Sequence, residues 1–243
     1  MKPILLVKTG IDIVMTALLL VVMGHHITEN LAHEAIGITI FVLFIVHHIL
    51  NYKWYKNLFK GKYTPARIFQ TTIDFLLFIC ILLLIVSAPM VSMDVLAFLN
   101  IGGAAVGRIL HRLCGIWSFI FMAIHLGFHV PMFIGMAKKA VRLSPMGNTL
   151  LKWILRLVLF AVCAYGIYAF TSRALWDDMF YLTEFQFMPS ETAVAFFSQY
   201  IALFVLFAAI GYYVRSALSE IYAQYHIAKA ERRKVVSIEE SNL

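Results

Sequence analysis

Long apolar runs alternate with short polar segments along the whole chain. Each run has close to the ~20 residues that an α-helix needs to cross about 30 Å of hydrocarbon. The runs cover residues 4–24, 32–52, 69–90, 107–134, 151–171 and 193–215. This pattern predicts an all-α integral membrane protein with six transmembrane helices.

The amino-acid composition supports the same fold class. Of the 243 residues, 62% are hydrophobic and 14% are charged, whereas about 25% of a typical soluble domain is charged. A lipid bilayer is therefore the expected environment. Lys2 and Lys8 flank the start of the first run, and no small-residue cleavage site follows it. We expect a retained helix rather than a signal peptide.

The basic residues predict the orientation of the helices. Of the 20 lysines and arginines, only Arg108, Arg112 and Arg173 lie on one side of the predicted membrane. By the positive-inside rule, the opposite side is cytoplasmic and holds both termini. The net charge of +7 is then explained by topology, and no nucleic-acid partner is expected.

Two of the apolar runs contain the same histidine motif. "HEAIGITIFVLFIVHH" and "HRLCGIWSFIFMAIH" both read H-x-x-x-G-I, then eight residues, then H. Ionisable side chains inside a membrane are costly and are functional candidates by default. The positions in register are His33, Gly37 and His47 in the first run, and His111, Gly115 and His125 in the second.

The spacing of the motif predicts two histidine pairs. Histidines 14 residues apart share one helix face and are separated by about 21 Å along the axis. Because both runs cross the membrane in the same direction, His33 should meet His111 near the outer surface and His47 should meet His125 near the inner one. Haem iron takes two axial ligands, commonly histidines. The sequence therefore predicts two haems, with Gly37 and Gly115 making room for a porphyrin edge.

Two further histidines leave the choice of ligands for the inner haem open. His48 is about 60° out of register with His33, and His129 lies on the same face as His111, so both are rivals for the inner haem. Buried carboxylates need partners. We expect Arg108 and Arg112, which flank His111, to neighbour the propionates of the outer haem.

These residues also resemble a known family. "LAHEAIGI…HHILNYKW" and "ILHRLCGI…HLGFH" are similar to the flavinylation-associated cytochrome b family of bacterial membrane proteins, which is distantly like ferric reductases and formate dehydrogenase cytochrome subunits. The resemblance covers about residues 5–135, and its more specific part is His47, Asn51 and Trp54. It implies b-type haem in the bacterial inner membrane and electron transfer, often to an extracytoplasmic flavoprotein. The ligands it implies are His33, His47, His111 and His125.

The expected organisation is a di-haem four-helix bundle in 1–135, two further spans with an outer loop in 136–215, and a basic cytoplasmic tail in 216–243. We expect the electron-transfer subunit of a membrane oxidoreductase. The sequence has no nicotinamide-binding unit, so the predicted donor is a quinol or a redox protein. The alternative is a metal-ion or proton transporter, since His125 and His129 have a zinc-binding spacing and Asp74 could join a proton relay.

Overall fold

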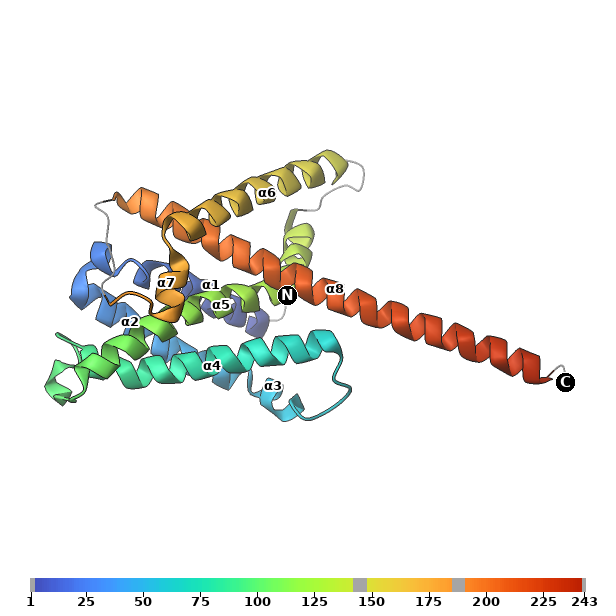
Figure 1. Ribbon diagram of the computed structural model, residues 1–243, viewed down its shortest axis with the longest axis horizontal. Helices are drawn as coiled ribbons and strands as arrows, with labels where there is room; N and C mark the ends of the chain where they lie inside the picture. Colours follow the sequence, from blue (N-terminus) through green and yellow to red (C-terminus); the bar gives the residue numbers. More distant parts are fainter. Residues whose placement is uncertain (1–2, 142–147, 185–190, 242–243) are drawn as a thin grey trace.

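The computed structural model describes residues 3–141, 148–184 and 191–241, and within these ranges it is helical and has no strand (Figure 1). Six helices are long and apolar enough to cross a membrane, as predicted. They are α1 (Pro3–Val22), α2 (His25–Leu50), α4 (Pro65–Val91), α5 (Ala104–Val141), α6 (Asn148–Ser172) and α8 (Ala193–Ser241). Three short helices connect them: α3 (Tyr52–Asn57), η1 (Ala97–Leu99) and α7 (Leu175–Phe180).

The first four long helices form two hairpins. α1 packs on α2, and α4 packs on α5. The turn between α1 and α2 contains Gly24, where a Cβ atom would lie 3.2 Å from the rings of Phe196 and Phe197. Thr64 caps α4 by accepting a hydrogen bond from the Arg67 amide, and Pro65 occupies the first turn, where a missing N–H costs nothing.

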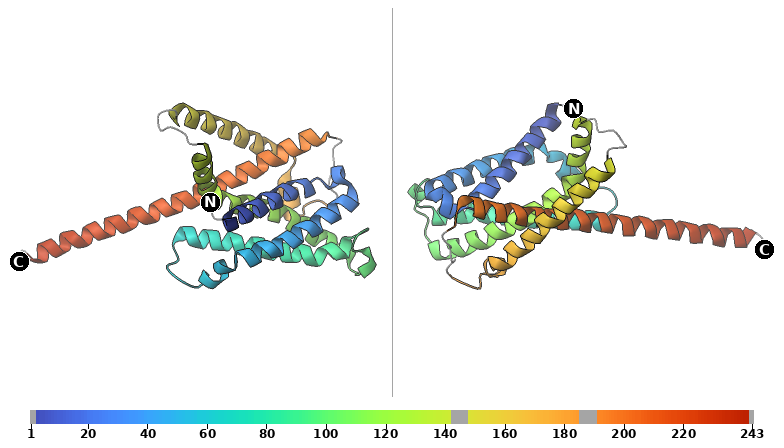
Figure 2. Two further views of the ribbon diagram at one scale, coloured as in Figure 1. Left: turned by 180° about the vertical axis from the view of Figure 1, so that it is seen from behind. Right: turned by 90° about the horizontal axis from the view of Figure 1, so that it is seen from above.

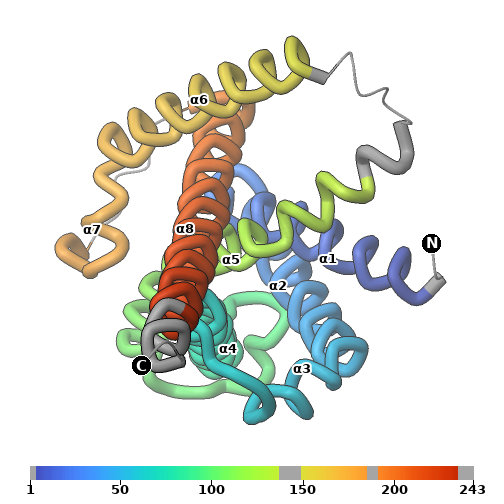
Figure 3. Tube along the Cα trace, turned by 90° about the vertical axis from the view of Figure 1, so that its right-hand side faces the viewer, coloured from blue at the N-terminus to red at the C-terminus, as the bar shows by residue number. Residues whose placement is uncertain are grey.

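Close packing joins α8 to both α5 and α6. Phe119 and Ala123 on α5 lie in one buried cluster with Ala169 on α6 and Leu203 on α8. Small residues allow close approach of the backbones: Gly127 on α5 lies against the α8 backbone. Figure 3 shows α8 between α6 and the remaining long helices. Helix α8 therefore packs directly on α5, α4 and α1.

Helix α2 is packed differently from α5. It has no fully buried residue, and within the described chain its extensive packing is on α1 alone. The two motif-bearing helices, α2 and α5, therefore face each other without close backbone packing.

The chain after residue 215 continues helix α8. α8 has 49 residues and projects beyond the other helices (Figure 2). Its length of about 74 Å exceeds the thickness of the hydrocarbon more than twofold. No glycine or proline follows Gly211 in this helix, so nothing in its sequence breaks it.

Candidate functional site

His33 on α2 and His111 on α5, the first pair, are brought together as predicted. Their ring centroids lie 6.0 Å apart, with the ring planes inclined at 61°. Two metal–nitrogen bonds of about 2 Å each, together with the radii of two imidazole rings, give a similar separation of about 6 Å. The spacing is therefore compatible with one metal ion held by both rings.

Both rings of the first pair use Nδ1 as a hydrogen-bond donor. His33 Nδ1 lies 3.0 Å from the carbonyl oxygen of Val22 on α1, which can only accept. His111 Nδ1 lies 3.3 Å from Ser87 Oγ on α4. The Ser87 hydroxyl gives its own proton to the Leu84 carbonyl, so its oxygen accepts from His111. In both neutral rings the lone pair is then on Nε2, the atom available to a metal.

His47 on α2 and His125 on α5, the second pair, are held by carboxylates inside the apolar helices. Asp12 Oδ1 on α1 lies 2.8 Å from His47 Nδ1, and Asp74 Oδ1 on α4 lies 2.7 Å from His125 Nδ1. An ionised carboxylate only accepts hydrogen bonds, so Nδ1 is again the donor. Asn51 Nδ2 lies 3.5 Å from His47 Nε2 but makes a shorter bond of 2.9 Å to the His47 carbonyl.

The four candidate ligands are therefore oriented by one repeated device. In each hairpin the preceding helix supplies the acceptors for Nδ1: α1 supplies those of the two candidate ligands on α2, and α4 those of the two on α5. A hydrogen bond to the second ring nitrogen fixes the tautomer and orientation of metal-binding histidines in general. The sequence motif located the histidines but not these acceptors. Two of the acceptors could have been identified from the sequence, because Asp12 and Asp74 are carboxylates within apolar helices.

His48 and His129 are placed close to the second pair. His48 lies within electrostatic range of His47 and His125, and the His125 and His129 rings are 4.9 Å apart. His48 Nδ1 lies 2.6 Å from the Tyr55 hydroxyl. Burial raises the pKa of Tyr55, so its hydroxyl stays protonated and can donate to Nδ1.

That hydrogen bond distinguishes His48 from His47. The Tyr55 hydroxyl can donate or accept, so it does not fix the tautomer of His48, whereas the Asp12 carboxylate keeps the proton of His47 on Nδ1. His129 makes no hydrogen bond to any described residue. The orienting partners therefore favour His47 and His125. Among the described residues, no ring contact joins His47 to His125.

His25 is a residue near the first pair that the sequence did not identify. It lies with His26 in the first turn of α2. The His25 ring centroid is 4.9 Å from that of His33. Its hydrogen-bond partner is the Asn30 side chain, at 3.4 Å.

Gly37 and Gly115 do not serve close helix packing. A Cβ atom built at either position would meet no other atom within 4 Å. At Gly127, Gly166 and Gly211, by contrast, it would collide with a neighbouring helix backbone. Because the two motif glycines lie one turn after His33 and His111, they keep space open beside the first pair.

Arg112 has partners that the sequence did not predict. Its guanidinium binds the Asp178 carboxylate and donates to the Thr183 carbonyl at 2.7 Å. It thereby ties the segment that contains α7 to α5, helped by a hydrogen bond from Trp117 Nε1 to the Met179 carbonyl. Arg108 is exposed and makes no hydrogen bond or ion pair with another described residue. Roles for both arginines at propionates stay predictions.

Glu34, next to His33, organises the loop that follows α4. Its carboxylate accepts hydrogen bonds from the Ser92 hydroxyl and from the backbone amides of Met93 and Val95, at 2.6 to 2.8 Å. Successive amides converging on one carboxylate form an anion-binding turn. Glu34 therefore fixes the α4–α5 connection against α2 beside the first pair.

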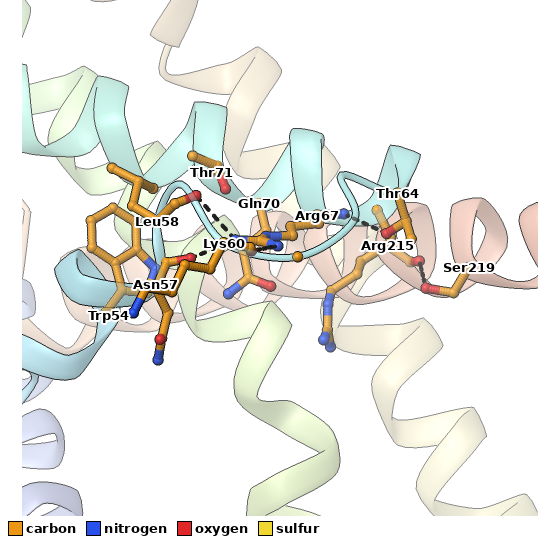
Figure 4. A pocket seen from close by; sticks show the side chains of 12 residues that line it. Trp54, Asn57, Leu58, Lys60, Thr64, Arg67, Gln70, Thr71, Arg215 and Ser219 are labelled. Atoms are coloured by element: carbon orange, nitrogen blue, oxygen red, sulfur yellow. Dashed lines mark hydrogen bonds between the residues drawn. The ribbon is translucent and has the colours of Figure 1, made fainter.

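A cavity of about 640 Å³ lies at the other end of the hairpins (Figure 4). Trp54, from the motif that includes His47, lines it together with Gln70 on α4 and Arg215 on α8. Arg67 shapes one wall by donating to the Lys60 carbonyl at 2.6 Å. Arg215 is within electrostatic range of His129, which places the cavity near the second pair.

Comparison of the chain with protein-family models, with curated proteins and with solved structures found no match. The resemblance carried by residues 5–135 therefore stays a prediction.

Proposed function

We propose that this protein is a di-haem b-type membrane cytochrome that passes electrons across the bilayer. His33 and His111 would hold one haem, and His47 and His125 the other. The observation that carries the proposal is the hydrogen bonding of the four rings: each donates Nδ1–H to an acceptor on the neighbouring helix. Nε2 is thereby left for iron in all four. Bound haem supplies one-electron chemistry by cycling between ferric and ferrous iron.

The protein's own residues prepare the space for this group. The open positions at Gly37 and Gly115 give a flat ring access to the backbones of α2 and α5. The loose packing of α2 against α5 supports the same reading, because two helices that bind a macrocycle between them cannot pack backbone to backbone. Helices α1 and α4 hold the histidine rings in position from behind.

The distribution of basic residues supports one orientation of the protein across the membrane. We place both termini and the α3–α4 connection in the cytoplasm of a bacterial cell, following the basic residues. The cavity beside Trp54 and Gln70 then faces the cytoplasmic side near the second pair, where a quinol or a redox protein would deliver electrons. The acceptor, such as a flavoprotein, would dock at the outer end.

Proton transport is the second candidate function, and the Asp12–His47 and Asp74–His125 pairs are the observation that favours it. Intramembrane carboxylate–histidine pairs occur in proton relays. A metal-ion pathway has less support, because the described residues include no group of three or more histidine, cysteine or acidic side chains arranged to hold a metal ion.

Haem content of ligand variants tests the proposal. We expect purified His111→Ala and His125→Ala proteins each to retain one haem per chain, while the wild type holds two. His226→Ala, in the exposed part of α8, is the matched control and should retain both. Unchanged haem content in both ligand variants would refute the assignment. A haem-free wild type that moves protons in vesicles would favour the relay.

A further inference from the structure

The two histidine pairs differ in what accepts their Nδ1 protons. The first pair donates to neutral groups, the Val22 carbonyl and the Ser87 hydroxyl, at 3.0 and 3.3 Å. The second pair donates to the carboxylates of Asp12 and Asp74, at 2.8 and 2.7 Å. Bonds of 2.7–2.9 Å to an ionised partner are the charge-assisted, stronger kind.

The carboxylates also lie where their charge has a large effect. Asp12 sits in the middle of α1 and Asp74 in the first half of α4. The side chains of Asp74 and His125 are 10% and 23% exposed, before any lipid is counted. Coulombic interactions are many times stronger at low dielectric constant than in water. Among the described residues no carboxylate accepts from Nδ1 of the first pair, and that of Glu34, next to His33, is bound to the Ser92 hydroxyl and the backbone amides of the following loop.

A carboxylate behind a ligating imidazole changes the iron that the imidazole binds. It pulls on the Nδ1 proton, makes the ring a more basic ligand and adds negative charge near the metal. Both effects stabilise ferric iron, which carries one more positive charge than ferrous iron. The reduction potential of that iron is therefore lowered.

We propose that Asp12 and Asp74 are positioning residues that make the haem of the second pair the lower-potential centre, with the haem of the first pair the higher. This inference rests on the proposed function. Electron transfer then runs downhill from His47 and His125 toward His33 and His111. With the orientation proposed above, that direction is from the cytoplasmic side outward.

A potentiometric titration of the purified haem-loaded protein tests this inference. Asp12→Asn and Asp74→Asn keep an oxygen that can accept from Nδ1 but remove the charge. Each should raise the ferrous-to-ferric ratio of the lower-potential haem about tenfold at a fixed ambient potential, which corresponds to about 59 mV for a one-electron couple. The other haem should not shift. Asp12→Glu keeps the negative charge and should keep the lower potential of the wild type. Glu220→Gln, on the exposed part of α8, removes one negative charge outside the site and is the control.

A second variant assigns the two potentials independently. His33→Ala should remove the haem of the first pair and leave only the lower potential. A remaining haem with the higher potential would overturn the inference, as would Asn variants that shift neither haem or both equally. If the Asn variants lose haem, the His33→Ala titration decides alone. A wild-type protein without haem would refute the proposed function itself, a distinct result.

Discussion

At the scale of single residues, the site is defined by what stands behind each histidine rather than by the histidines alone. His47 and His48 are adjacent in sequence, yet one donates Nδ1–H to Asp12 and the other faces the Tyr55 hydroxyl. Only His47 has a partner that fixes Nδ1 as the donor and leaves Nε2 for a metal, which favours it over His48 as the ligand. Asn51 adds a further support, because it accepts a hydrogen bond from Lys8 Nζ at 3.0 Å and so joins α1 to the end of α2.

Glu34 gives a residue-scale prediction about stability. Glu34→Ala leaves the amides of Met93 and Val95 and the Ser92 hydroxyl without their acceptor. Losing a partner of a polar group costs about 1–3 kcal/mol. We expect faster hydrogen exchange at residues 92–95 and a lower temperature of thermal denaturation. Glu29→Gln, an exposed change on the same helix, should alter neither. Unchanged exchange in Glu34→Ala would show that the loop is held by other contacts.

At the scale of elements, periodicity and length were enough to predict the six long helices, because a bilayer demands one apolar stretch per crossing. The repeated motif also placed His33 opposite His111. Two features could not be read from the motif. The acceptors Asp12, Asp74, Ser87 and Val22 come from other helices, and the position of α8 against α5 depends on glycine contacts between distant segments.

The motif glycines give a prediction at this scale. Gly37→Leu or Gly115→Leu would place a side chain in the open space between α2 and α5 without disturbing a helix contact. We expect each variant to fold and to lose one of two haems. Gly135→Leu, also at an open position of α5, should keep both. Full haem occupancy in both motif variants would mean that no macrocycle lies beside these glycines.

At the scale of the whole molecule, the chain is two hairpins braced by α8. Each hairpin pairs a histidine helix with a helix that supplies acceptors, and the two histidine helices face each other. The central packing of α5 against α8 and α6 leaves α2 as the loosely held wall. The six candidate spans, an even number, predict that both ends of the chain lie on one side of a membrane.

Orientation can be tested on intact cells. Asn100→Cys, in the exposed connection between η1 and α5, should react with a membrane-impermeant maleimide from outside. Ser219→Cys, on α8 beyond the predicted span, should react only after the cells are opened. The three native cysteines lie within apolar helices, so the parent protein provides the background. The reverse labelling pattern would invert the membrane orientation and with it the direction of electron flow.

The central claim is that the four oriented histidines bind two haems. A reduced-minus-oxidised visible spectrum of the detergent-purified protein, with haem quantified per chain, tests it most directly. We predict two low-spin b-type haems per chain, each with two nitrogen ligands. A protein purified from haem-replete cells that folds but shows no haem absorbance would contradict the account.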